Sequence, residues 1–207
     1  MKRTWMVGTA VVVAAMAAQA GPRKPQTDAL VTVVTYDRAD VPWVVRVRAE
    51  QVATAAFAAA GIEVKWLVGK QLGRRREVTS GEVLTVVFDG LAPAQASPEA
   101  MAFTNVGGAA DADVHVFYSR VAGFGGFHNR LYAPELLGNV LAHELTHALE
   151  GVARHSSEGL MKAAWSTDDY AKMARRRPLA FAAEDLELLR AHFSKETSPA
   201  PTLVAAR

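Results

Sequence analysis

Three histidines and one glutamate between Val140 and Met161 have the types and the spacing needed for metal-assisted hydrolysis. His143 and His147 lie four positions apart, so on a helix both imidazoles share one face and reach the same metal ion. Glu144 stands beside them, where a carboxylate can act as general base on a metal-bound water. This H-E-x-x-H arrangement is typical of zinc hydrolases, in which zinc activates water and polarises the carbonyl under attack.

A third nitrogen ligand is expected a short distance downstream. Gly151 can end the helix in the left-handed conformation that other residues adopt only at a cost, and the chain then turns to bring back His155. Three protein ligands leave the fourth position of zinc open for water, as catalytic sites require. A chance match is the alternative for a pattern this short, but the Gly turn, the third histidine and the turn containing Met161 all agree with zinc.

The helix that carries the first two histidines is predicted to run from Ala133 to Glu150, with Pro134 tolerated in its first turn. Apolar residues at helical spacing form a stripe on it: Leu137, Leu141, Leu145 and Ala148. The histidines point away from that stripe. One face of the helix should therefore pack on a sheet while the other faces a cleft.

The chain ahead of this helix predicts a sheet. β-Branched or alternating runs predict five strands, at Leu30–Tyr36, Ile62–Val68, Val83–Phe88, Met101–Val106 and Val114–Val121. A helix from Val44 to Ala60, starting near Pro42, connects the first two strands and predicts that they pair in parallel. Gln71–Gly81 and Leu91–Glu99, between the later strands, and Gly123–Gly126, after the last strand, are expected to be loops.

Two shorter helices are expected after the third histidine. Ser166 or Thr167 can cap a helix that runs to about Arg176, and Ala183–Phe193 is amphipathic. We expect one domain over residues 21–207, with an N-terminal subdomain of about 28–151 and a C-terminal subdomain of about 152–197.

Residues 1–20 have the pattern of a secretory signal peptide. Lys2 and Arg3 precede an apolar run from Met6 to Ala18, and Ala18-Gln19-Ala20 forms a cleavage site. The run is shorter than the ~20 residues that span a membrane. We therefore expect a secreted or periplasmic protein without a membrane span after cleavage, and the absence of cysteine excludes disulfides.

The charge distribution gives no indication of nucleic-acid binding. The formal net charge is only +2, and the basic residues are dispersed apart from Arg74–Arg76 and Arg175–Arg177. Neither triplet has aromatic neighbours suited to stacking bases. The expected partner is a peptide or protein substrate, and the expected state is a monomer.

Other candidate residues have weaker signals. His115 lies in a predicted strand and His192 on the last helix, where structural or surface roles are expected. His128, in the loop before the metal-binding helix, is a candidate for lining the cleft because loops often carry function. Tyr170 is expected to be a packed helix residue, with a phenol near the cleft as the alternative.

With these features in place, the chain resembles the metzincin clan of zinc peptidases. The stretch H-E-L-T-H-A-L-E-G-V-A-R-H-S-S-E-G-L-M-K-A-A-W is similar to a group of small secreted bacterial proteins with H-E-x-x-H-x7-H spacing. The resemblance implies an α+β metzincin-like fold, with a mixed, mostly parallel twisted sheet, one antiparallel edge strand, a backing helix, an active-site helix and a short helical C-terminal part. It also implies His143, His147 and His155 as zinc ligands, Glu144 as base, and Met161 beneath the site.

Two departures from the clan's pattern stand out. Glu150 occupies the position of the usual Gly, and His155 comes eight residues after His147, which places two extra residues in the turn. Ala163 stands where some metzincins carry a tyrosine that stabilises the transition state.

The sequence thus predicts a secreted zinc metalloendopeptidase that binds an extended peptide along the edge strand at Met101–Val106. Two alternatives remain open: a zinc-stabilised binding protein without catalysis, which the missing tyrosine keeps open although the intact Glu144 argues against it, and a zinc hydrolase acting on a non-peptide amide with the same residues.

Overall fold

A computed structural model describes residues 29–69, 81–106, 113–124 and 132–196 of the chain. The predicted signal peptide, His128 and all but the last residue of the predicted loop Gln71–Gly81 lie outside the described residues. No helix within the described ranges is both long enough and apolar enough to cross a membrane.

Five strands form a single sheet: β1 (Leu30–Asp37), β2 (Glu63–Val68), β3 (Glu82–Asp89), β4 (Ala102–Thr104) and β5 (Val114–Phe117). Their order is β2-β1-β3-β5-β4. The pairs β1–β2, β1–β3 and β3–β5 are parallel, whereas β4 is antiparallel to β5 at the edge. The predicted fold class, a mostly parallel sheet with one antiparallel edge strand and covering helices, is confirmed.

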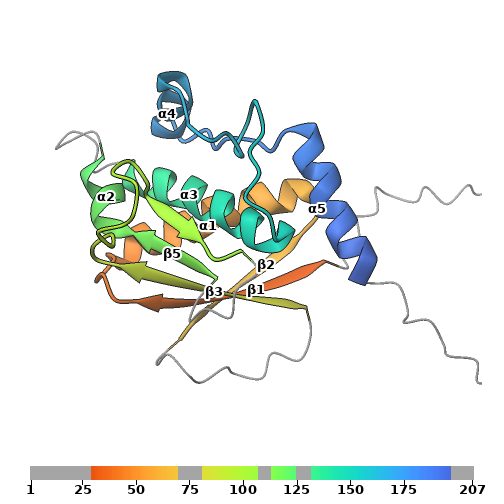
Figure 1. Ribbon diagram of the computed structural model, residues 1–207, viewed down its shortest axis with the longest axis horizontal. Helices are drawn as coiled ribbons and strands as arrows, with labels where there is room; N and C mark the ends of the chain where they lie inside the picture. The colour runs from red at the N-terminus through yellow and green to blue at the C-terminus, as the bar shows by residue number, and fades with distance from the viewer. Residues whose placement is uncertain (1–28, 70–80, 107–112, 125–131, 197–207) are drawn as a thin grey trace, which may run out of the picture.

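Two long helices, α1 (Trp43–Ala60) and α3 (Ala133–Glu150), cover the same face of the sheet (Figure 1). They approach each other closely at Gly138, where an added Cβ would lie 2.5 Å from the Cβ of Val52 and 2.8 Å from the carbonyl oxygen of Ala49. Because α1 is rich in alanine and α3 has a glycine at the contact, the two backbones can pack this tightly. Almost every residue of α3 from Ala133 to Leu149 is buried, which fixes the helix rigidly.

One predicted element is wrong. The strand expected through Val121 ends at Phe117, and Tyr118–Gly123 forms a short helix, α2. The physical reason lies in the neighbouring strands, because Phe117 pairs with Asp89, the last residue of β3, and no further strand residues are left to pair with. The helical turn then buries Val121.

The C-terminal part consists of α4 (Thr167–Ala174), which lies above α3 in Figure 1, and α5 (Ala183–Glu196), which lies to the right of α3. The predicted cap is confirmed: the Ser166 hydroxyl accepts the backbone N–H of Asp169, and the Asp169 carboxylate accepts that of Ser166. Asn139 ties this part to α3, because its side-chain oxygen accepts the N–H of Leu179 at 3.0 Å.

Candidate metal centre

His143 and His147 of α3 point their Nε2 atoms at each other across 3.0 Å. The Nδ1–H of His143 donates to the carbonyl oxygen of Leu160 at 3.0 Å, and that of His147 donates to the carbonyl oxygen of Val152 at 3.1 Å. A carbonyl only accepts, so each Nδ1 must carry the proton and each neutral ring keeps a lone pair on Nε2. Two lone pairs that face each other at this distance are suited to sharing a cation, as zinc-binding imidazoles do.

His155 completes the cluster from the turn that follows α3. One ring nitrogen from each of His143, His147 and His155 can be chosen so that all three lie within 4.8 Å of one another. The turn starts at Gly151, which has the predicted left-handed conformation (φ 65°) and donates its N–H to the carbonyl oxygen of His147 at 2.9 Å. The His155 side chain is exposed, whereas the other two rings are buried. The structure therefore brings together the three predicted ligands.

The residues on either side of His155 are anchored to α5 by a buried carboxylate. Asp185, which is fully buried, accepts from the Arg154 guanidinium at 2.8 Å and from the Ser156 hydroxyl at 2.5 Å. The same guanidinium also donates to Glu150 at 2.8 Å. These bonds tie the turn to the end of α3 and to α5. The sequence pattern did not single out Asp185, because it lies 31 positions from Arg154 and its partner is set only by the tertiary fold.

The turn containing Met161 is connected to both histidine segments. The carbonyl oxygen of Leu160 accepts from His143 Nδ1 and also from Trp165 Nε1, each at 3.0 Å. The N–H of Ser156 donates to the carbonyl oxygen of Met161 at 2.8 Å, and the Met161 side chain is fully buried. The orientation of the first predicted ligand thus depends on this turn.

Glu144, the predicted base, is bonded to the edge strand. Thr104 of β4 places its Oγ1 2.6 Å from Oε2 of Glu144, to which it donates, and 3.0 Å from the Glu144 carbonyl oxygen. Burial raises the pKa of the Glu144 carboxyl, while the Thr104 hydrogen bond and the nearby His147 and His155 partly lower it. Sequence reasoning missed Thr104, whose only signal was its place in the predicted edge strand.

The two buried histidines are held in the form that binds metals. Burial lowers the pKa of His143. Burial and the neighbouring His143 lower the pKa of His147 to about 4. Both rings are therefore neutral at neutral pH, so a metal ion can bind without first displacing protons from them.

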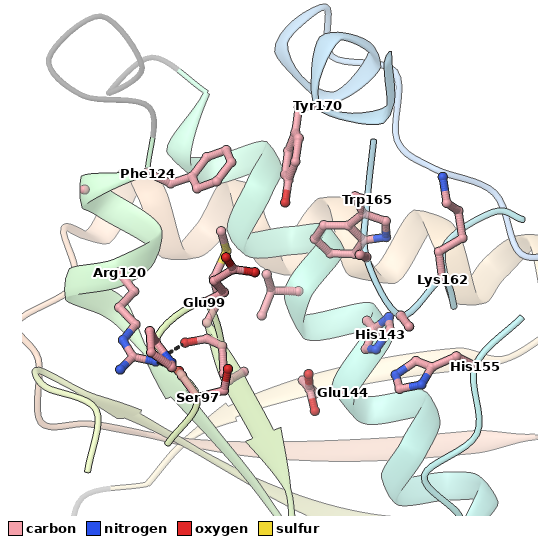
Figure 2. Close-up of a pocket in the computed structure, with 18 residues that line it drawn as sticks. Ser97, Glu99, Arg120, Phe124, His143, Glu144, His155, Lys162, Trp165 and Tyr170 are labelled. Atoms are coloured by element: carbon pink, nitrogen blue, oxygen red, sulfur yellow. Dashed lines mark hydrogen bonds between the residues drawn. The ribbon is translucent and has the colours of Figure 1, made fainter. Parts of the chain in front are cut away.

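A hollow of about 850 Å³ opens beside this cluster (Figure 2). His143, Glu144 and His155 lie at one end of it. Its other walls come from the 97–102 segment, α2, α3 and the chain that follows Met161; the lining includes Glu99, Met101, Arg120, Phe124, Val140, Lys162, Ala163, Trp165 and Tyr170.

The remaining predicted residues lie in different settings. His115 is bonded through Nδ1 to Asp89 at 2.7 Å and stacks on Phe103 with ring centroids 4.8 Å apart, which is a structural role. His192 is bonded to Glu82 at 2.8 Å. Tyr170 lines the hollow with its hydroxyl turned inward (Figure 2).

Comparisons with known proteins complete the description. No protein-family model and no curated protein matches the sequence. Among solved structures, the archaemetzincin of Methanopyrus kandleri is similar to this chain, with a TM-score of 0.49 and 16% sequence identity. The likeness covers 82% of this chain and 98% of that one.

Proposed function

We propose that the protein is a zinc-dependent peptidase. The observation that carries this proposal is the convergence of three imidazole nitrogens within 4.8 Å of one another, beside the carboxylate of Glu144 and at the end of an open hollow. Three imidazole nitrogens with a neighbouring carboxylate are the donor set of a catalytic zinc site rather than of a closed structural one.

Each residue has a role that follows from its contacts. His143 and His147 would hold the ion through Nε2, since their Nδ1 atoms are engaged by carbonyls. His155 would supply the third nitrogen from the anchored turn. When bound, zinc lowers the pKa of a water molecule and acts as a Lewis acid towards the substrate carbonyl.

Glu144 takes the proton from the attacking water and passes it to the leaving amine. Thr104 occupies Oε2 of the carboxylate, which leaves the other oxygen for this proton. Burial raises the carboxyl pKa, which brings its proton affinity closer to that required near neutral pH.

The edge strand β4 offers a surface for an extended peptide. It is the last strand in the order β2-β1-β3-β5-β4, and its far side pairs with no other strand of the described sheet. A peptide that adds to this edge runs past Thr104, and thus past the carboxylate of Glu144 to which Thr104 is bonded. We place the activity outside the cytoplasm because residues 1–20 have the pattern of a cleaved export signal.

The test combines metal content with substrate screening. Zinc-loaded protein is incubated with a broad peptide library, with and without a chelator, alongside Glu144→Gln and a matched variant, Glu187→Gln, at an exposed position of α5. We expect one zinc per chain in all three proteins, chelator-sensitive hydrolysis by the wild type and Glu187→Gln, and none by Glu144→Gln. Zinc binding without hydrolysis of any peptide would refute peptidase activity and favour a binding protein, or a non-peptide amide if cell-wall fragments are cleaved instead.

A further inference from the structure

The hollow beside the metal centre has an aromatic wall that begins at a predicted ligand. The ring of Trp165 lies 5.8 Å from that of His143 and 6.2 Å from that of Tyr170, and Tyr170 lies 4.5 Å from Phe124. The indole N–H of Trp165 is already used by the Leu160 carbonyl, so the ring offers the hollow its apolar surface.

Four acidic or basic side chains other than histidine and tyrosine line the hollow; two of them are engaged elsewhere, and a third, Glu144, is the proposed base. Lys162 donates to Asp169 at 2.5 Å and is directed away from the hollow in Figure 2. Glu144 is bonded to the edge strand, and Arg120 is turned towards backbone carbonyls. The carboxylate of Glu99 has no hydrogen-bond or ion-pair partner among the described residues, and Figure 2 shows it turned into the hollow.

The backbone on both sides of Glu99 is held by hydrogen bonds. Arg120 of α2 donates to the carbonyl oxygens of Ser97 at 2.5 Å and of Ala100 at 2.6 Å, on the two sides of Glu99. The N–H of Ala100 also closes a turn onto the Ser97 carbonyl at 3.0 Å. The guanidinium itself rests 5.4 Å from the ring centroid of Phe117. Arg120 thus fixes the backbone on both sides of Glu99, whose carboxylate is left for a ligand.

A carboxylate opposite a wall of aromatic rings is an arrangement that recognises cations, because the charge and the ring faces attract the same group. We propose that this hollow binds a long basic side chain of the substrate, arginine or lysine, next to the bond that is cleaved. The apolar stem of such a side chain would contact Val140 and Met101, and the charged end would lie between Glu99 and the ring of Tyr170.

This inference rests on the proposed peptidase function for its placement of the scissile bond. Because the hollow starts at Glu144 and borders β4, a peptide added to β4 directs one of its alternating side chains into it. The substrate class that follows is peptides with a basic residue adjacent to the cleaved bond.

The first experiment measures binding without requiring catalysis. Zinc-loaded Glu144→Gln protein is titrated with N-acetylarginine amide and N-acetylnorleucine amide, two probes of similar length that differ in charge, and binding is followed by NMR chemical shifts. We expect the arginine probe to bind about tenfold more tightly. Adding Glu99→Gln should remove the difference, whereas adding the control Glu187→Gln should preserve it.

The second experiment uses the active protein. Peptides in which each position is varied in turn are assayed for kcat/KM with the wild type, Glu99→Gln and Glu99→Lys. We expect a preference of about tenfold for arginine or lysine beside the cleaved bond, lost in Glu99→Gln and shifted towards glutamate in Glu99→Lys.

The two experiments separate the two proposals. If no peptide is cleaved but the arginine probe depends on Glu99, the peptidase function is wrong and the cation site stands. If peptides are cleaved without a basic preference, or if Glu99→Gln leaves the preference or the binding difference intact, the inference about the hollow is overturned.

Discussion

The anchoring of the His155 turn to α5 predicts that a residue distant from the metal in sequence controls metal affinity. Asp185→Asn keeps the size of the side chain but removes its charge. The variant weakens two bonds that a buried carboxylate accepts from Arg154 and Ser156, at 2.8 and 2.5 Å. Bonds to a buried charge contribute about 1.5–3 kcal/mol each, so we expect a loss of about 3 kcal/mol in the free energy of unfolding.

The effect on zinc should be separable from that on stability. Residues that orient metal ligands typically alter affinity by about 10–100-fold, and the exposed His155 depends on its neighbours for its position. We therefore expect zinc affinity, measured by competition with a chromophoric chelator, to fall within that range in Asp185→Asn. Urea unfolding of the metal-free protein measures the change in the free energy of unfolding.

A second buried acid provides the control. Glu135, at the start of α3, accepts from Arg48 at 3.0 Å, and its side chain forms no hydrogen bond with the His155 turn among the described residues. Glu135→Gln should cost comparable stability and leave zinc affinity unchanged. If Asp185→Asn proves too unstable to purify, Ser156→Ala removes one of the two bonds. Wild-type zinc affinity in a destabilised Asp185→Asn protein would refute the role of α5 in holding His155.

Three other predictions follow from contacts of the site and its scaffold. Thr104→Val removes the hydrogen bond that lowers the pKa of Glu144, so the acidic limb of the pH profile of kcat/KM should move to higher pH. Thr104→Ser keeps the hydroxyl and should restore the wild-type profile. An unchanged acidic limb in Thr104→Val would exclude the bond from catalysis. In metal-free protein the pKa of His147 is about 4, below its unfolded value of ~6.5. Between these two pH values the unfolded chain binds more protons than the folded one. The free energy of unfolding should therefore fall by at most about 3 kcal/mol as the pH drops from ~6.5 to about 4. Because the raised pKa of Glu144 acts in the opposite direction, His147→Gln is the comparison, and the same pH slope in both proteins would contradict the assignment. Gly138→Ala would place a Cβ 2.8 Å from the Ala49 carbonyl oxygen. We expect the cost of overpacking, about 1–3 kcal/mol, to outweigh the gain of about 1 kcal/mol in helix propensity. A variant that is more stable than the wild type in urea would show that α1 and α3 can separate.

The features that were predictable from sequence are those set by local pattern. The helix that carries His143 and His147 has the predicted bounds, Ala133–Glu150, because its apolar periodicity lies within the segment and Gly151 follows it directly. The edge position of the short strand near Thr104 was also predictable, since a brief strand that follows a loop with two prolines rarely lies in the middle of a sheet.

The features that were missed depend on distant partners. The end of β5 at Phe117 is set by where β3 ends, and the alternation of residues through Val121 carries no information about that neighbour. The Asp185 bonds to the His155 turn and the Thr104 bond to Glu144 join segments that only the folded chain brings together. Residue types and spacing thus identified the candidate ligands, but not the groups that orient them.

Under the proposed function, the Leu160 carbonyl, which accepts from both His143 and Trp165, couples metal retention to substrate choice on one side of the hollow. Any replacement of Trp165 that reshapes the aromatic wall also removes a donor from the atom that orients the first ligand. The opposite wall has no such restriction, because Arg120 fixes the turn that holds Glu99, and within the described ranges this turn forms no hydrogen bond with the three predicted ligands. Efforts to redirect this protein to new substrates should therefore start from Glu99, where substitutions can change selectivity without weakening metal binding.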